Sequence, residues 1–555
     1  MLVELRGNPV AGPATGVHER VRHPRRHRCE LVVVDDASLG NQDARRPGSG
    51  IEVVLEQRVE VGVQRWCSPT LAASLVRGRA RSATLFLLIL PWSHTAVRLG
   101  PDYSTMSALY VNIDRGRGMR ALGPGERIVA LADGGRATSL DSARPSPYLA
   151  RFGVQAQADD GIATARIQIG GKSLLVAAQD ESFLRGSVGA NHGDALRALF
   201  VSATQERPAA VLLLAASGGV RLHEANAAEL SLARALRALL DGRAAGIVVL
   251  AVAVGDVFGG ASILACAATR TAMLPNARLG LSGPKVIESV HGKWELDADD
   301  ARDVEAVFGA RARSAMGFVE LLVDDVDAVR AWLSRAARER DDFAVSVAAT
   351  HARLRERIEG ETAHTPPFEA LACFDGAAPV DNGGRLWLRD ECWLTRPHPA
   401  TALGPADLHA QDEALLAHVA RGRADAPKVV LLVEDSAGHV VSRGSEMRFQ
   451  SQFLAHHAAV LALLRARGYR LIGVLAGVGH SAAFFTNALQ ATALYALAHS
   501  RVVVMEPSAL ARVTGLPAAS LIEDDPLLGQ PVRHLDAQGA VAAIIPDASL
   551  ASLGF

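Results

Sequence analysis

The most constraining feature of this 555-residue sequence is a pair of continuous apolar runs, each followed by a small-residue turn and a helical pattern. The runs cover residues 209–216 and 246–254. The first leads into Ser217-Gly218-Gly219, and the second leads into a turn that ends in Gly259-Gly260. Strands that are apolar on both faces and alternate with helices are typical of a parallel sheet covered on both sides. The pattern therefore predicts an α/β fold.

The same unit returns in the second half of the chain. It has Ser436 after its first strand and Ser481-Ala482 after its second strand, where the first half has Ser217 and Gly259-Gly260. The spacing from Ser217 to Gly259 is 42 residues, and that from Ser436 to Ser481 is 45. This internal repeat predicts two copies of one domain. The elements expected in the second copy are a strand over 428–436, a helix over 444–468 and a strand over 469–477.

Two parts of the chain lack this regular pattern. Residues 18–30 form an Arg- and His-rich run with no hydrophobic period, and ordered-looking sequence begins soon after Met106. Charged helical sequence over 328–361 is followed by a Pro- and Gly-rich stretch, which indicates a domain boundary. The expected organisation is a disordered extension or mis-assigned start over 1–105, a first domain over 106–345, a linker over 346–394 and a second domain over 395–555.

Composition excludes several classes of protein. The net charge of −1 disfavours a nucleic-acid-binding protein, which usually has a basic excess. The clean apolar run at residues 85–90 is far shorter than the roughly 20 residues that span a bilayer. Five scattered cysteines without a CxxC pair argue against both a disulfide framework and a cysteine zinc site. We interpret His18, His23, His27 and Cys29 as part of a polar tract, expect no metal site, and expect a cytoplasmic location.

The two glycine pairs of the first half are the strongest candidate for chemistry. Gly218-Gly219 and Gly259-Gly260 each lie between a buried strand and a helix start, 41 residues apart. Small residues there allow close approach of a ligand to the backbone, and free N–H groups at a helix start favour negative charge. Such amides can stabilise an oxyanion or an enolate. Tight packing between helix and strand is the alternative explanation for the glycines.

The corresponding candidates in the second half are Gly479, His480, Ser481 and Ala482. Ser481 as a nucleophile with His480 as its base is disfavoured, because adjacent residues rarely point into one site, and a helix-capping role for Ser481 is the simpler interpretation. His480 is a candidate proton donor, with water as the alternative. Other motifs fail on spacing: the Gly255–Gly260 turn lacks a P-loop lysine, and His223-Glu224 does not extend to HExxH.

Longer motifs in both halves resemble a known family. In the first half, GKSLLVAAQDESFLRGSVGANHGDALRAL, AASGGVRLHEAN, GDVFGGASI and ARLGLSGPKVIE resemble the carboxyltransferase branch of the crotonase-like (ClpP/crotonase) superfamily. RLHEAN and GPKVIE look most like the beta subunit of biotin-independent malonate decarboxylase. In the second half, the stretch from VEDSAGHVVSRGSEMRF to YRLIGV, with MEPSALARVTGLP, resembles the gamma subunit of that complex. The chain therefore looks like a fusion of both subunits.

The resemblance implies two crotonase-like carboxyltransferase-type domains and decarboxylation of a malonyl thioester to the acetyl thioester and CO₂. The thioester would be carried by an acyl-carrier subunit with a phosphoribosyl-dephospho-coenzyme A arm, and an acyl-carrier transferase subunit would load it. No cofactor is expected on this chain, and an oligomer is expected. Two alternatives stay open: a biotin-dependent acyl-CoA carboxyltransferase, which shares the fold, and a non-catalytic scaffold that binds an acyl carrier.

The composition of residues 1–105 leads to a first prediction. If this segment adds nothing to the fold, a chain that begins at Met106 should melt at the same temperature as the full chain. Calorimetry of the two chains under identical conditions checks this. A large drop in melting temperature on truncation would show that the segment contributes to the folded core.

Overall fold

The computed structural model describes residues 74–80, 83–89, 108–109, 118–140, 142–420 and 428–555. The chain divides into two compact units, Met1–Thr95 and Ala96–Phe555. In the first unit, strands β1 (Ser74–Ala80) and β2 (Ala83–Ile89) pair in an antiparallel hairpin. The remainder of the predicted extension over 1–105 lies outside the described residues, so that interpretation stays a prediction.

The second unit contains two large mixed sheets. The first sheet has eight strands in the order β10-β9-β8-β7-β6-β5-β4-β3. Its strands β6 to β10 run parallel, and β5 pairs with β6 in an antiparallel hairpin turned by Gly170 and Gly171. The strands are β3 (Ala108–Leu109), β4 (Ala137–Ser139), β5 (Ile162–Ile169), β6 (Lys172–Gln179), β7 (Ala210–Ser217), β8 (Val249–Val257), β9 (Arg270–Met273) and β10 (Val319–Leu321).

The second sheet repeats this plan with seven strands in the order β11-β12-β13-β14-β15-β17-β19. Antiparallel strands β11 to β13 lead into the parallel strands β13 to β19. A short parallel pair, β16 (Val478–His480) with β18 (Arg501–Val503), lies after β15 in the chain. The sheet strands are β11 (Ala378–Pro379), β12 (Leu386–Arg389), β13 (Cys392–Thr395), β14 (Val429–Glu434), β15 (Arg470–Leu475), β17 (Ala493–Leu497) and β19 (Ala543–Ile545).

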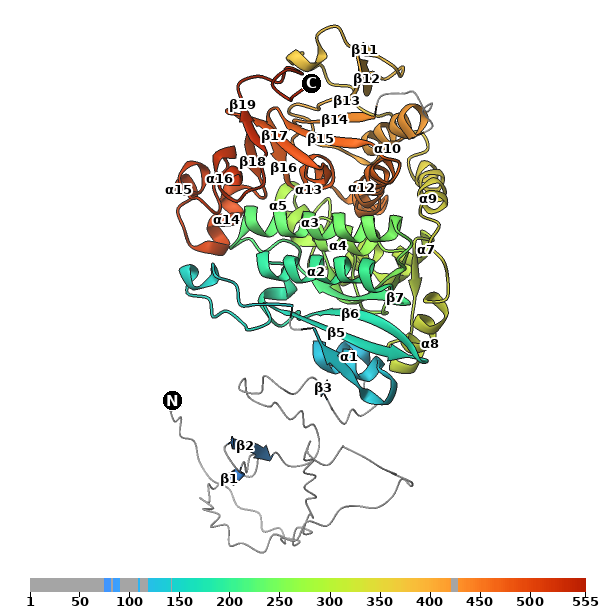
Figure 1. Cartoon of the computed structure of the whole chain (residues 1–555), viewed down its shortest axis with the longest axis vertical. Helices are drawn as coiled ribbons and strands as arrows, with labels where there is room; N and C mark the ends of the chain where they lie inside the picture. Colours follow the sequence, from blue (N-terminus) through green and yellow to red (C-terminus); the bar gives the residue numbers. More distant parts are fainter. Residues whose placement is uncertain (1–73, 81–82, 90–107, 110–117, 141, 421–427) are drawn as a thin grey trace, which may run out of the picture. The chain divides into compact units, whose positions relative to one another are not determined.

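Helices cover the sheets and fill the space between them. Helices α3 and α12 contact each other and lie between the two sheets (Figure 1). Their buried residues belong to one apolar core that includes β7, β8 and β14, so the core is continuous across the halves. No helix in the described ranges is both long and apolar enough to cross a membrane. The helices used below are α2 (Ala190–Glu206), α3 (Ala225–Ala244), α4 (Gly260–Cys266), α5 (Pro284–His291), α7 (Ala310–Ala315), α9 (Phe343–Arg357), α10 (Pro405–Ala414), α11 (Arg443–Met447), α12 (Gln450–Ala466) and α13 (Ser481–Thr486).

The structure differs from the sequence prediction in two places. Residues 378–395, expected largely within a linker, form β11 to β13 of the second sheet, because Leu386, Trp393 and Leu394 are buried against it. The helix expected over 444–468 is two helices, α11 and α12, separated at Phe449, whose φ of 72° is left-handed.

A buried ion pair joins the two halves. The Arg313 guanidinium on α7 contacts the Glu446 carboxylate on α11 at 3.1 Å, and the two side chains are 0% and 1% exposed. Arg313 also donates to the Leu279 and Glu446 carbonyl oxygens, at 2.7 and 2.6 Å, and its guanidinium lies over the Phe449 ring. Burial raises the pKa of Glu446, and the Arg313 charge opposes that rise. The pair therefore ties the first-half segment around Leu279 to the second half.

Removal of one partner of this pair should destabilise the protein strongly. Glu446→Ala leaves the Arg313 charge buried and unpaired, which costs about 3–5 kcal/mol. Urea denaturation should show this as a lower midpoint. Glu320→Ala is the matched control, since the Glu320 carboxylate pairs with Arg270 at the surface and should be worth about 1 kcal/mol or less. Equal losses in both variants would contradict the account.

Candidate functional site

The first turn of the site follows β7. Gly218 is exposed, and Gly219 has a φ of 96°, which favours glycine. The Gly218 N–H donates to the Arg185 carbonyl oxygen at 2.8 Å, and the Gly219 N–H donates to Ser217 Oγ at 3.2 Å. These bonds fix the turn and leave the next amide, that of Val220, without an acceptor in the described part of the chain.

The second turn follows β8 and lies in backbone contact with the first. Gly259 has a φ of 59°, and its N–H donates to the Leu281 carbonyl oxygen at 2.9 Å. A Cβ on Gly259 would lie 3.1 Å from the Gly219 Cα, and a Cβ on Gly219 would lie 3.2 Å from the Gly259 Cα. Both close packing and backbone conformation therefore require these two glycines.

The free donors are not the ones that the sequence indicated. The amides of Gly218 and Gly259 are already bonded, and that of Gly219 makes a longer bond to Ser217. Among the described residues, the amides without an acceptor at these turns are those of Val220, Gly260 and the next residue of α4. Glycines 218, 219 and 259 thus shape the turns, while Val220 and Gly260 present N–H groups.

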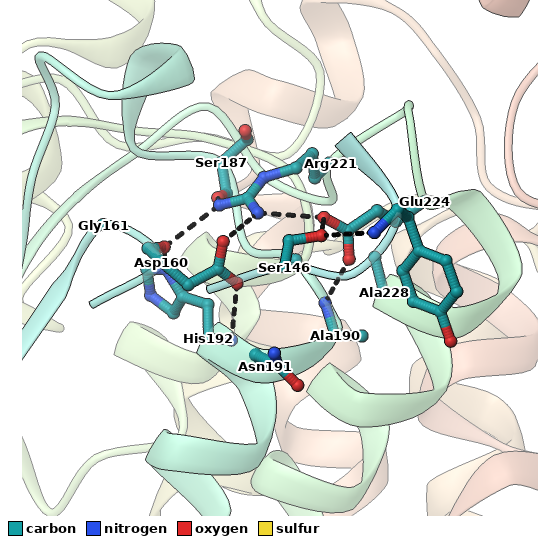
Figure 2. A network of polar contacts seen from close by, with 12 residues as sticks. Ser146, Asp160, Gly161, Ser187, Ala190, Asn191, His192, Arg221, Glu224 and Ala228 are labelled. Atoms are coloured by element: carbon teal, nitrogen blue, oxygen red, sulfur yellow. Dashed lines mark hydrogen bonds and ion pairs between the residues drawn. The ribbon is translucent and has the colours of Figure 1, made fainter. Parts of the chain in front are cut away.

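A buried polar network holds the chain just after Val220 (Figure 2). The Arg221 guanidinium, 1% exposed, pairs with Asp160 and, at 2.9 Å, with Glu224. It also donates to the Ser187 carbonyl oxygen at 2.9 Å. In the backbone, the Arg221 N–H donates to the Val188 carbonyl oxygen at 2.9 Å. Arg221, the residue next to the free Val220 amide, is therefore held in place by these four contacts.

The same network anchors the start of α2. Glu224 accepts from the Ala190 N–H at 2.7 Å and from the Ser146 hydroxyl at 2.8 Å, and Asp160 accepts from the His192 N–H at 2.9 Å (Figure 2). Burial raises the pKa of Asp160 to about 6, against the opposing effect of the Arg221 charge. It lowers the pKa of His192 to about 3, so His192 is neutral. Sequence reasoning missed this network. The signal that could have indicated it is the Arg-x-x-Glu spacing beside the Gly-Gly turn.

The second half contains an equivalent pair of turns. Gly438 has a φ of 87° and donates its N–H to Ser436 Oγ at 3.3 Å, as Gly219 does to Ser217. Ser481 has a φ of 47°, close to that of Gly259. In the described chain, the amides of His439 and Ala482 lack acceptors, just as those of Val220 and Gly260 do. Each half therefore presents free N–H groups from both of its turns.

The structure gives no support to a Ser481 nucleophile. Ser481 Oγ has no hydrogen-bond partner among the described residues, and the His480 ring packs on Gly438 instead, where a Cβ would lie 3.1 Å from its Cγ. The α13 helix has His480 at its N-cap and no side-chain cap, so Ser481 is not a capping residue either. Gly479 is buried in β16, next to His480.

A chain of contacts connects the turns of the two halves. Leu281 accepts the Gly259 N–H, and the next residue, Ser282, places its Oγ 3.3 Å from His439 Nε2. Glu446 accepts from both the Leu281 and Ser282 N–H groups, at 3.0 and 2.7 Å. Burial lowers the pKa of His439 to about 4 and also lowers that of His480, so both imidazoles are neutral at pH 7. The site thus lies where the halves meet.

Two other polar regions lie away from these turns. A cavity of about 920 Å³ is lined by residues of α9, α10 and the segment before β12, and none of the turn residues lines it. Two of its lining residues, His409 and Glu413, come close to His351. The two imidazole rings stack at 4.1 Å and 12°, so their in-plane lone pairs cannot converge on one ion. Hydrogen bonds, such as the 2.7 Å contact from His351 to Glu413, explain the cluster.

Both halves of the chain match known protein families. Residues 126–366 match the family model of the carboxyl transferase domain, and residues 408–552 match that of the malonate decarboxylase gamma subunit. The malonyl-S-ACP:biotin-protein carboxyltransferase MADC of Malonomonas rubra is 32% identical over 219 residues, which are 36% of this chain and 69% of that protein. The chain belongs to the malonate decarboxylase branch of the carboxyltransferase family. The predicted α/β fold with two carboxyltransferase-type, crotonase-like domains is confirmed.

Two further relatives match parts of this chain. The carboxyl transferase subunit beta of acetyl-coenzyme A carboxylase from Limosilactobacillus fermentum is 29% identical over 189 residues, 33% of this chain and 63% of that protein. The chain therefore spans just under two thirds of that relative. A chain of a Pseudomonas malonate decarboxylase hetero-tetramer, solved in complex with malonate, is 32% identical; the match covers 45% of this chain and 94% of that chain, with a TM-score of 0.41.

Proposed function

We propose that the chain decarboxylates a malonyl thioester to the acetyl thioester and CO₂. The observation that carries this proposal is the pair of free N–H groups of Val220 and Gly260 on two turns in backbone contact. When the bond between the methylene carbon and the carboxylate breaks, its electron pair enters the thioester as an enolate. Two fixed backbone donors suit the oxygen on which that charge develops. The arrangement lowers the barrier without any group on the chain that must react covalently.

The enolate carbon must then take up one proton. His439 and His480 are the imidazoles of the second-half turn, and burial keeps both neutral at pH 7 by lowering their pKa values. Neither imidazole therefore carries an acidic imidazolium proton, and we propose water as the proton source. This choice keeps His480 as the alternative donor.

The partners follow from the family. We propose that the thioester is carried by an acyl-carrier subunit with a phosphoribosyl-dephospho-coenzyme A arm, that an acyl-carrier transferase subunit exchanges the acyl group, and that the chain works within a hetero-oligomeric malonate decarboxylase complex. The solved Pseudomonas complex is a hetero-tetramer. Because the chain carries both a carboxyl transferase domain and a gamma-subunit domain, it would supply two parts of such a complex.

A second candidate function is transfer of the malonyl carboxyl group to a biotin protein. The name of the Malonomonas rubra relative favours it, since that protein is a biotin-protein carboxyltransferase. The free amides of His439 and Ala482 also give the second half a place for another developing negative charge. In this reaction the carboxyl group would move from the malonyl methylene to a biotin nitrogen, and a proton would replace it.

Gly259→Val tests the role of the glycine turn. A β-branched side chain at a φ of 59° is strained, and its Cβ would press on Gly219, so the two turns must separate and misplace the Gly260 amide. Loss of one such donor should lower the rate of CO₂ release by roughly 10²-fold or more, with a smaller effect on substrate binding. Radiolabelled CO₂ release from a malonyl thioester measures this.

Gly246→Val is the matched control. Gly246 has a φ of 86°, and a Cβ there would have no atom within 4 Å, so the substitution carries the same backbone strain away from the site. It should keep the wild-type rate. Wild-type turnover in a folded Gly259→Val variant would remove this turn from the mechanism. Abolition of activity by avidin would instead favour the biotin-dependent reaction.

A further inference from the structure

A strained turn lies directly against the first-half glycine turn. Leu184, Arg185 and Gly186 are three successive residues with left-handed φ values of 47°, 58° and 67°. A Cβ on Gly186 would overlap the Ala216 carbonyl oxygen, so glycine is required there. Left-handed backbone is strained for an ordinary residue, and such strain gathers at functional sites. Arg185 therefore occupies a position where glycine would be more stable.

Arg185 lies next to the exposed part of the turn that leads to the Val220 amide. Its carbonyl oxygen accepts the Gly218 N–H at 2.8 Å, and a Cβ on Gly218 would lie 3.7 Å from the Arg185 Cβ. Both residues are exposed. The Arg185 side chain thus begins beside the turn that leads to the free Val220 amide.

The Arg185 guanidinium has no ion pair or hydrogen bond with any residue in the described ranges. Two other arginines of this region are occupied: Arg221 pairs with Asp160 and Glu224, and Arg127 contacts Glu181 at 3.5 Å. Arg185 is therefore a cation beside the turn that is left for a ligand, and its planar fork matches a carboxylate through two hydrogen bonds.

We propose that Arg185 binds the free carboxylate of the malonyl group and so selects malonyl over acetyl thioesters. This inference rests on the proposed function. One methylene separates the malonyl carboxylate from the thioester carbonyl, so a carbonyl oxygen at the Val220 and Gly260 amides brings the carboxylate to the surface that Arg185 borders. The phosphates of a coenzyme A-like arm lie at the far end of the pantetheine chain. After CO₂ has left, the acetyl product lacks the group that Arg185 holds.

The test measures binding rather than turnover. Calorimetry with four probes, the malonyl and acetyl thioesters of pantetheine and of coenzyme A, separates the carboxylate from the phosphates. Arg185→Gln should weaken the binding of both malonyl probes about tenfold or more, which is the range expected for a hydrogen bond to a charged group. It should leave the affinity for both acetyl probes within about twofold of the wild-type value. Arg197→Gln is the matched control, an exposed arginine on α2, and should change none of the four affinities.

Arg185→Gly gives a readout that a purely structural role would not. Glycine relieves the left-handed strain, so its melting temperature should rise while its affinity for malonyl probes falls. Equal losses for the two coenzyme A probes alone would show that Arg185 binds phosphate, and unchanged affinities would show that it binds neither group; both outcomes overturn the inference. If the wild type binds malonyl probes through Arg185 yet releases no CO₂, the proposed function fails and this site stands.

Discussion

The buried pair of Arg313 and Glu446 is the interaction on which the rest of the site depends. The Glu446 carboxylate belongs to the second half, yet it accepts the amides of Leu281 and Ser282 in the first half. Leu281 in turn accepts the Gly259 N–H. A charge in one half therefore sets the position of the glycine turn in the other. The two halves share one continuous core, which keeps this carboxylate in place beside the first-half turn.

The two halves use the same turn with different residues. In each half a serine hydroxyl accepts the N–H of the glycine two residues later, Gly219 or Gly438. The amide that follows the glycine, that of Val220 or His439, stays free. They differ where the second turn meets the helix, since the first half has Gly259 and the second has Ser481 in the left-handed region. Backbone contact between Gly219 and Gly259 permits no side chain, whereas the second half accommodates one. The repeat thus preserves backbone donors while its side chains diverge.

Hydrophobic periodicity made the strands, the repeat and the two glycine turns predictable from sequence. The free amides were not, because hydrogen bonds from Gly218 to Arg185 and from Gly259 to Leu281 join segments distant in the chain. The Arg313–Glu446 pair was hidden for the same reason, and many arginines in the sequence made none of them stand out. Strands β11 to β13 were missed because their flanking Pro- and Gly-rich sequence indicated a linker.

In the proposed reaction the amides of Val220 and Gly260 hold the thioester oxygen. Infrared spectroscopy of an acetyl thioester labelled with ¹³C at the carbonyl tests this claim directly, since the acetyl group binds without reacting. Two hydrogen bonds weaken the carbonyl double bond, so the account predicts a lower stretching frequency for the bound thioester than for the free one. An unchanged frequency on binding would contradict it.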